Sequence, residues 1–462
     1  MASSSVQTFG VELELLVFYT TYSRPLPAEE IRRYGPVIKC PFCMDIVLPP
    51  GIAPKYPNFD KLPGAWVRQK VADVISEAGF KARSSWRAKG HEPDLFDYWN
   101  VVPDISLKIN EDFEFAYSPL QAVGVEINSP VLVAGEEAFN EVLTVVKAIN
   151  SAFRTAVPPM CGLHIHVGRG REALTLRTVQ RSASLLWLAG NLIETLHPRS
   201  RLNNRHCLGI EKCNLSTGMT AKEAAGDWKL GKRQHVKLSL DRVDKDRKKP
   251  THYQYTPPAT LPNYPGSTLS LAVAREHGFR FEEPEHKEIP DVLDGVRSIL
   301  RATDTGTIAE LTGSTAHRGA YNFSNMARRA GEIPEGWIMP PWKTPDGEVI
   351  PSGWEDCPVE SEPDTAVQRH TNKVIREAPR KPTIEFRQGA GSLDGEWIVI
   401  WAKICLALTG PAVVESSNDD FFQLLYNCVK AKEQPSEYDV FDLLHDIGIS
   451  KEDLDAVYHP VL

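Results

Sequence analysis

Four short segments of the 462-residue chain alternate apolar residues with ionisable or amide residues at a period of two. The segments are Val11–Leu15 (VELEL), Val125–Asn128 (VEIN), Leu163–Val167 (LHIHV) and Ile384–Arg387 (IEFR). Successive side chains of a β-strand point to opposite faces of the sheet, so each segment predicts a strand with one apolar face. The apolar faces must pack against other elements, and the polar groups must collect on the opposite face.

Strand and helix patterns follow one another in mixed order along the rest of the chain. Strands are predicted at 8–19, 80–86, 98–108, 113–117, 122–128, 163–168, 307–312, 318–323 and 383–388. Helices are predicted from Trp66 to a stop at Gly79 and at 136–156, 172–196, 290–302, 395–409, 418–432, 437–446 and 450–457. Because the strands alternate rather than forming continuous apolar runs, we expect an α+β fold. Its largely antiparallel sheet would have one solvated face and helices on the other face.

Three segments lack this periodicity and are rich in proline, glycine or mixed charge: 20–63, 218–288 and 332–370. We interpret them as insertions in a single catalytic domain that spans 1–462 and ends in a helical segment, 395–462. Segment 218–288 is expected to be an appendage or a lid rather than part of the sheet. Its Lys/Arg-rich part, 229–248, contains interleaved acids, which favour a solvated loop over a nucleic-acid patch.

Composition narrows the classes of function. The chain has 52 Lys and Arg against 60 Asp and Glu, a net charge of -8, whereas binders of nucleic acid or anionic membranes are usually basic. No apolar run approaches the roughly 20 residues of a membrane span, and the N-terminus lacks a signal-peptide pattern. Eight cysteines, mostly in apolar segments, suggest a cytoplasmic protein with free thiols. Cys40 and Cys43 form a Cys-x-x-Cys pair, but the spacing of Cys207 and Cys213 is poor for a second zinc-binding pair.

The polar face of the predicted strands carries groups that bind metals and phosphates: Glu12, Glu14, Glu126, His164, His166, Glu385 and Arg387. A solvated outer face would account for any one strand. Clustered carboxylates, however, repel one another unless a cation lies among them. Carboxylate oxygens with an imidazole suit Mg²⁺ or Mn²⁺ better than structural Zn²⁺, and an arginine can hold a phosphate beside the metal.

These segments, with several others, resemble the amidoligase family, which is similar to the carboxylate–amine ligases of the glutamine synthetase superfamily. The resemblance rests on Phe9–Leu15, Trp99–Leu107, Gly124–Pro130, Cys161–Gly168, Pro198–Arg201, Arg318–Phe323 and Thr383–Asp394. It implies a glutamine synthetase-like catalytic domain whose curved antiparallel sheet forms an active-site funnel. It also implies an ATP-dependent ligase that uses Mg²⁺ or Mn²⁺ and joins a small carboxylic acid to an amine through an acyl phosphate. The substrates would resemble amino acids or peptides.

The resemblance also implies roles for individual residues. The metal ligands would be Glu12, Glu14, Glu126, His164 and Glu385. The catalytic residues would be Arg387, on the transferred phosphoryl group, with Glu126 and Asp104. Contacts to ATP would come from Arg387, Arg318, Asn322 and Arg201, and contacts to the substrates from Ser106, His166 and Asn128.

Two other functions are compatible with the same residues. A metal-dependent hydrolase also uses His-x-His pairs, but it would need more His or Asp ligands than this glutamate-rich set offers. A catalytically inactive binding homologue is disfavoured by the complete set of Glu, His and Arg. The sequence leaves the oligomeric state open and names neither the acid nor the amine.

Overall fold

The computed structural model describes most of the predicted elements of the chain. The described residues are 6–21, 28–29, 32, 36–40, 62–84, 96–104, 106–107, 120–170, 172–202, 207–230, 292–313, 319–326, 342–343, 349–350, 382–433 and 436–458. The predicted strand at 113–117 and residue Arg318 lie outside them.

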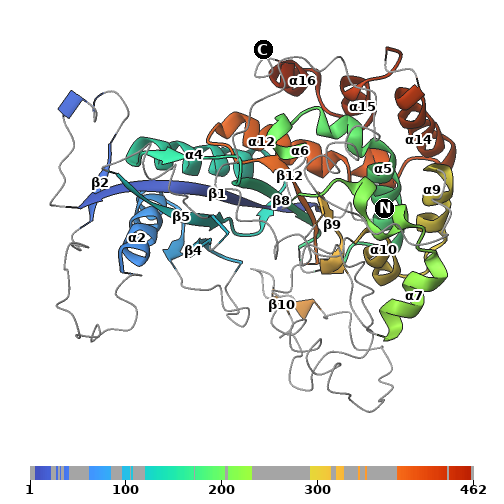
Figure 1. Ribbon diagram of the computed structural model, residues 1–462, viewed down its shortest axis with the longest axis horizontal. Coiled ribbons are helices and arrows are strands. Elements are labelled where there is room, and N and C mark those ends of the chain that lie inside the picture. Colours follow the sequence, from blue (N-terminus) through green and yellow to red (C-terminus); the bar gives the residue numbers. More distant parts are fainter. Residues whose placement is uncertain are drawn as a thin grey trace, which may run out of the picture.

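A sheet of ten described strands forms the centre of the molecule (Figure 1). Seven strands follow one another in the order β3-β4-β5-β1-β8-β12-β9, and β2, β6 and β7 also pair with β1. The strands are β1 (Thr8–Thr21), β2 (Ile38–Cys40), β3 (Ala82–Ser84), β4 (Trp99–Pro103), β5 (Gln121–Asn128), β6 (Leu132–Val133), β7 (Thr155–Ala156), β8 (Gly162–Gly168), β9 (Tyr321–Asn322) and β12 (Ile384–Ala390). The β1–β2 and β3–β4 pairs are parallel and the other pairs antiparallel, which confirms a largely antiparallel sheet. A separate hairpin joins β10 (Trp342–Lys343) to β11 (Val349–Ile350).

Helices surround the sheet and complete a mixed α and β architecture. The α-helices are α2 (Leu62–Glu77), α4 (Glu136–Ala152), α5 (Leu176–Glu194), α6 (Arg199–Leu202), α7 (Ala221–Leu230), α9 (Val292–Arg301), α10 (Thr305–Thr312), α12 (Gly395–Ala407), α13 (Pro411–Val414), α14 (Asn418–Glu433), α15 (Val440–Asp446) and α16 (Lys451–Tyr458). Short 3-10 turns lie at η2 (Ile210–Lys212), η3 (Asn214–Thr217) and η5 (Ser324–Met326).

The apolar face of the strands and the apolar stripes of the helices share one core. Ile127, Ile165 and Phe386 on the sheet are fully buried in the same cluster as Val71 of α2 and Trp401 of α12. Helix α4 also lies over the sheet, beside α12 (Figure 1). Burial of these side chains fixes the strand register, because a slip of one residue would turn the apolar set away from the core. The polar side chains therefore stay on the opposite face.

Three sequence-based expectations need correction. Segment 307–312 is not a strand but most of helix α10, whose first turn is capped by the Asp304 side chain accepting from the Thr307 amide. Its residues are buried all round, so hydrophobic periodicity could not distinguish a short buried helix from a strand. Segment 20–63, interpreted as a loop, contains the end of β1, strand β2 and the start of α2.

The predicted insertion 218–288 begins with helix α7, which packs against α10 and buries Ala224 completely. Residues 231–291 lie outside the described part of the chain, so its role as an appendage stays a prediction.

The third correction concerns Gly395–Val414, a 20-residue stretch with a mean hydropathy of 1.8 that meets the length and composition of a membrane span. Of the 18-residue window within this stretch that meets the criteria, 67% is buried in the protein, and Trp401 and Ile404 are wholly buried, as in the core of a folded protein.

The cysteines within the described residues are buried and are not joined to one another by disulfide bonds. They are Cys40, Cys161, Cys207, Cys213, Cys405 and Cys428. Cys43, the second member of the Cys-x-x-Cys pair, lies outside the described residues.

Candidate active site

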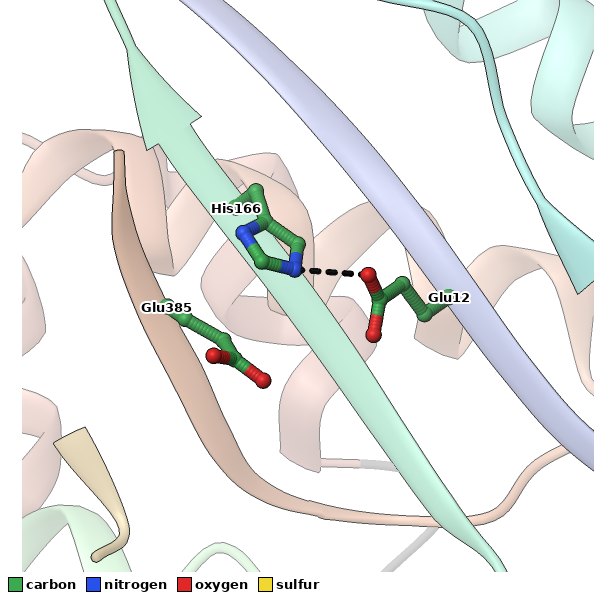
Figure 2. A group of neighbouring side chains, drawn as sticks. All are labelled: Glu12, His166 and Glu385. Carbon is green, nitrogen blue, oxygen red and sulfur yellow. Dashed lines mark hydrogen bonds and ion pairs between the residues drawn. The ribbon is translucent and has the colours of Figure 1, made fainter. Parts of the chain in front are cut away.

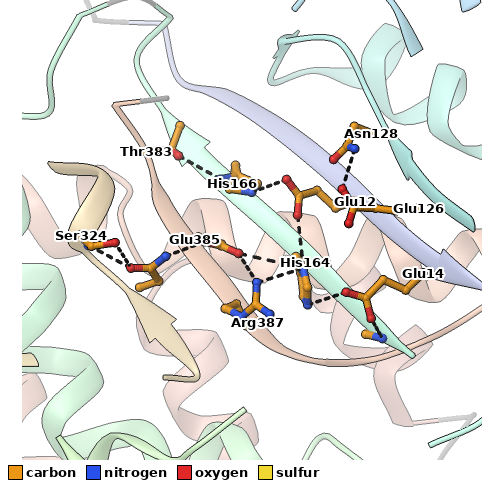
Figure 3. A network of polar contacts seen from close by, with 12 residues as sticks. Glu12, Glu14, Glu126, Asn128, His164, His166, Ser324, Thr383, Glu385 and Arg387 are labelled. Atoms are coloured by element: carbon orange, nitrogen blue, oxygen red, sulfur yellow. Dashed lines mark hydrogen bonds and ion pairs between the residues drawn. The ribbon is translucent and has the colours of Figure 1, made fainter. Parts of the chain in front are cut away.

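The register of the central strands sets the polar side chains in neighbouring rows. Glu12 on β1 lies opposite His164 on β8 and opposite Asn128 on β5. Glu14 lies opposite Glu126. Directly opposed residues project from the same face of a sheet, so these side chains meet although more than 100 residues separate them along the chain (Figure 3).

Strand β12 extends the same face on the other side of β8. Glu385 lies opposite both His166 of β8 and Asn322 of β9. After Phe386 the register shifts, and the Arg387 amide donates to the carbonyl of Ala320. This irregularity keeps the Arg387 side chain at the site, where Nη1 lies 3.4 Å from His164 Nδ1.

Glu12 lies between the two histidines. Its Oε1 is 2.8 Å from His166 Nε2, and its Oε2 is 3.2 Å from His164 Nδ1. An ionised carboxylate can only accept, so each of these ring nitrogens carries a proton in this arrangement. His166 Nδ1 also lies 2.9 Å from the Thr383 hydroxyl, which fixes the orientation of the ring.

Glu385 is almost wholly buried, with 1% of its surface exposed, and has strong polar partners. Arg387 Nη1 donates to its Oε1, and the Asn322 side-chain amide donates to its Oε2 at 2.6 Å. Asn322 in turn accepts from the amide of Ser324 at 3.0 Å. Burial alone would raise the pKa of Glu385, but the charges of His166 and Arg387 lower it to about 2. Glu385 is therefore ionised at neutral pH.

A second group of carboxylates lies on the β4–β5 side of Glu12. One carboxylate oxygen from each of Glu14, Asp104 and Glu126 can be chosen so that all three lie within 4.8 Å of one another. Within the described residues no Lys or Arg forms an ion pair with them. Among the described residues, the Glu126 carboxylate accepts a hydrogen bond from the Asn128 amide alone, at 2.8 Å.

Burial and repulsion leave this second group partly protonated at neutral pH. Burial, followed by the charge of Glu12, raises the pKa of Glu126 to about 8. Burial also raises the pKa of Glu14. Proton uptake is the expected response of crowded carboxylates that lack a cation, and a bound divalent ion would replace the proton.

The donor atoms fit a divalent cation in two places. Ligand atoms of Glu12, His166 and Glu385 lie within 4.8 Å of one another, and the carboxylates of Glu14, Asp104 and Glu126 form the other group (Figure 2 shows the first). Mainly carboxylate oxygen with one imidazole nitrogen is the donor set that suits Mg²⁺ or Mn²⁺. The grouping places His166 rather than His164 with Glu12 and Glu385, and it adds Asp104, which the resemblance assigned to catalysis.

His164 lies between the two groups. Its Nε2 is buried, has no hydrogen-bond partner in the described part of the chain, and lies 3.5 Å from Glu14 Oε1. The Gly162 amide donates to the other oxygen of Glu14 at 2.7 Å. An added Cβ at Gly162 would lie 2.6 Å from His164 Nε2 and 2.5 Å from Arg201 Nη2, so the site leaves no room for a side chain there.

The remaining residues predicted from the sequence lie at the edges of this cluster. Ser106 is exposed, and its amide donates to Asp104 at 2.7 Å. Asn128 binds Glu126, and Asn322 binds Glu385. Arg201 is buried and donates from Nη2 to the Arg387 carbonyl at 2.9 Å.

Sequence reasoning missed three contributors: Thr383, Ser324 and Gly162. The Thr383 hydroxyl contacts His166 on the neighbouring strand, and Ser324 donates from its amide and its hydroxyl to the Asn322 side chain two residues earlier. Nothing in their local sequence distinguishes these two residues from other hydroxyl residues. Gly162 lies two residues before His164, the first histidine of the His-x-His pair, and so occupies the same face of the strand. This position was the one indication in the sequence that Gly162 belongs to the site, because a glycine within a strand often marks a place where another group approaches the backbone closely.

Comparison with known proteins agrees with this picture. Residues 5–254 match the family model described as "Putative amidoligase enzyme", which is just over half of the chain and includes β1, β4, β5 and β8 but not β12. No curated protein and no solved structure gave a match. With a family model matched over more than half its length and its buried Glu and His groups gathered on one sheet face, the chain belongs to the amidoligase family.

Proposed function

We propose that this protein is an ATP-dependent carboxylate–amine ligase that uses Mg²⁺ or Mn²⁺. Membership of the amidoligase family supports a ligase-type activity. The dependence on ATP and on a metal ion is supported by one observation: two groups of metal-competent side chains and an arginine lie on a single face of the sheet. Such an arrangement suits phosphoryl transfer between anions, in which metal ions and an arginine neutralise the transferred group.

Amide formation from a free acid needs activation, because a carboxylate is a poor acyl donor at neutral pH. In the proposed reaction the substrate carboxylate attacks the γ-phosphorus of ATP, ADP leaves, and an acyl phosphate forms. The amine then attacks the acyl carbon, the C–O bond to phosphate breaks, and the amine loses a proton. Inorganic phosphate and the amide are the products.

Two groups of side chains would hold the metal ions, namely Glu12, His166 and Glu385 and, separately, Glu14, Asp104 and Glu126. When bound, the ions would neutralise the phosphate oxygens of ATP and orient the γ-phosphoryl group. His164, between the groups, would have its Nδ1 proton held by Glu12. The ligand set predicted from the resemblance would thus gain His166 and Asp104.

Arg387 would bind the transferred phosphoryl group. Its guanidinium is anchored by Glu385 at Nη1, and its Nε is buried and has no hydrogen-bond partner among the residues that the structure describes. An arginine presents several N–H donors in a planar fork that matches phosphate oxygens, which lysine cannot reproduce. Asp104 and Glu126, on the far side of Glu12, would accept the proton of the incoming amine.

The polar sheet face would form the floor of a glutamine synthetase-like funnel. Ser106 and Asn128, near the second carboxylate group, would contact the acid or the amine, which we expect to be small and similar to an amino acid or a peptide. We place this reaction in the cytoplasm, with small molecules as the partners.

The test is nucleotide turnover in purified protein. ADP release should require an acid and an amine together, should require Mg²⁺ or Mn²⁺, and should stop when EDTA removes the metal. Arg387→Lys should lower this ADP release by about 10³-fold, whereas Arg297→Lys, on the exposed surface of α9, should leave it unchanged. Hydrolysis of amides without nucleotide would instead support a metal-dependent hydrolase. Absence of both activities across a panel of amino acids and short peptides would count against the ligase.

A further inference from the structure

The row of the sheet next to Glu14 and Glu126 consists of Leu16 on β1 and Gly124 on β5. The register pairs these two residues directly. They lie two positions from Glu14 and Glu126 (Figure 3), and side chains two residues apart in a strand project from the same face. Beyond the carboxylates the polar face therefore continues with one apolar side chain and one position that has no side chain.

The chain that follows β4 covers this position. Strand β4 pairs with β5 up to Pro103, which lies opposite Val125. Beyond that pair the backbone crosses the polar face at Gly124, where an added Cβ would lie 3.0 Å from the Asp104 carbonyl oxygen and 2.8 Å from the Cβ of Leu107. These distances leave no room for a side chain. Gly124 is thus the place where a second stretch of backbone lies directly on the sheet.

Leu107 attaches this stretch to the sheet. Its side chain is 6% exposed and lies in a small apolar cluster with Leu16 and Cys161, each of which is 1% exposed. The cluster is distinct from the main core, which holds the apolar side chains of the opposite face. Burial of apolar surface is favourable, so the contacts of Leu107 fix the place of the segment that carries it.

The same segment carries Asp104, three residues before Leu107. One carboxylate oxygen of Asp104 lies within 4.8 Å of oxygens of Glu14 and Glu126. Such crowded carboxylates repel one another. Among the described residues the Asp104 carboxylate accepts a hydrogen bond only from the amide of Ser106, at 2.7 Å, which belongs to its own segment. The force that keeps Asp104 beside the other two carboxylates must therefore come from the attachment of the segment.

We propose that Gly124 and Leu107 are positioning residues that hold the Asp104 carboxylate beside Glu14 and Glu126. Leu107 supplies the attachment, because its burial opposes the repulsion between the carboxylates. Gly124 supplies the space, because any larger residue would push the Asp104 backbone off the sheet. The proposal rests on the proposed function only for the metal ion that the three carboxylates would share, and not on the ligase reaction.

Two variants of the full chain remove the two parts of this arrangement. Leu107→Ala removes the buried side chain, and Gly124→Ala places a Cβ against the Asp104 carbonyl. Mn²⁺ binding is followed by electron paramagnetic resonance, and Glu14→Gln identifies the binding step that belongs to the three carboxylates. Both variants should weaken that step by about 10–100-fold, the usual effect of losing a residue that orients a metal ligand. The other step should not change.

Matched controls separate positioning from a loss of stability. Leu132 is also 6% exposed but packs in the main core, so Leu132→Ala removes an equally buried leucine elsewhere. Gly135→Ala adds a Cβ that would meet nothing within 4 Å. Both controls should keep both Mn²⁺ binding steps. An equal loss of both steps in Leu107→Ala would indicate a general loosening of the sheet and would overturn the proposal.

A double-mutant cycle tests the positioning in protein without any metal. Asp104→Asn removes one of three crowded charges and should raise the midpoint of urea unfolding. In the Leu107→Ala background the Asp104 carboxylate can move away, so the same substitution should raise the midpoint less. Equal shifts in the two backgrounds would overturn the proposal. Failure of the unmodified protein to bind Mn²⁺ would count against the proposed function, and the cycle would still decide the role of Leu107.

Discussion

Binding of Mn²⁺ to the metal-free protein should release a proton from Glu126. The carboxylate lies with Glu14 and Asp104, has no cation partner among the described residues, and has a pKa raised to about 8 by burial and by Glu12. A metal ion that takes Glu126 as a ligand requires its ionised form. The proton must therefore leave when the metal binds.

The size of the release follows from that pKa. A group with a pKa of about 8 is roughly 90% protonated at pH 7 and roughly 10% protonated at pH 9. Metal binding should thus release about 0.9 proton from Glu126 at pH 7 and about 0.1 at pH 9. The metal affinity should rise with pH over the same interval, because less proton has to be displaced.

Calorimetric titration with Mn²⁺ in buffers of different ionisation enthalpy measures the number of protons released. Glu126→Gln should lose about 0.9 proton of the release at pH 7, and Glu77→Gln, an exposed residue at the end of α2, should change nothing. A release that is the same at pH 7 and pH 9, or that survives Glu126→Gln, would refute the assignment.

The raised pKa of Glu126 also makes the stability of the metal-free protein depend on pH. The folded-state pKa of Glu126 lies above its ordinary value of 4.5, so the folded metal-free protein binds more protons than the unfolded chain between these values. The contribution of Glu126 to stability is fully present below about pH 4.5 and is lost as the pH rises through about 8. It amounts to a few kcal/mol, since one pKa unit corresponds to about 1.4 kcal/mol. Glu126→Gln should remove this loss in chemical denaturation of metal-free protein at alkaline pH.

Three further substitutions test individual contacts. Arg387→Lys should lower acid-dependent ADP formation by about 10³-fold in steady-state kinetics, while the nucleotide Kd from equilibrium binding changes little. If activity instead falls only in proportion to the loss of folded protein, Arg387 has a structural role. Gly162→Ala should weaken Mn²⁺ binding, because the new Cβ would lie 2.5 Å from Arg201 Nη2 and 2.6 Å from His164 Nε2. Gly135→Ala is the control, since its new Cβ would meet nothing within 4 Å. Equal Kd values for Mn²⁺ in the two variants would refute the close-packing argument. Asn322→Ala leaves the buried Glu385 without one donor and should lower the free energy of unfolding by about 1–3 kcal/mol in denaturant titrations; an unchanged midpoint would contradict it.

Strand alternation was enough to predict the two faces of the sheet. Glu12 and Glu14 had to share a face because the leucines between and after them need burial, and the same reasoning applied to His164 and His166. It could not predict which histidine joins which carboxylate. That depends on cross-strand register, which places Glu385 beside His166, and register is a property of the assembled sheet.

Other features required the tertiary structure as well. Asp104 follows β4, and only the pairing of β4 with β5 brings it to Glu126. Helix α10 was misread as a strand because its residues are buried on every side, which removes the period of 3.6 that identifies an amphipathic helix. Burial of the site was also underestimated: the face expected to be solvated leaves His164 only 2% exposed.

The two metal-competent groups differ in electrostatics, and this difference predicts an order of metal binding. Glu385 is already ionised, because the charges of His166 and Arg387 lower its pKa, so this carboxylate can bind a cation without first losing a proton. The group with Glu14 and Glu126 must first lose one.

At pH 7 the Glu12 group should therefore fill first, and the Glu14 group should fill at lower concentration of metal as the pH rises to 9. Electron paramagnetic resonance of free Mn²⁺ at the two pH values measures both binding steps. Glu14→Gln should remove the pH-dependent step and keep the other, and Glu385→Gln should do the reverse. If both variants lose the same step, the two groups act as one site, and the separation of the carboxylates by His164 has no consequence for metal binding.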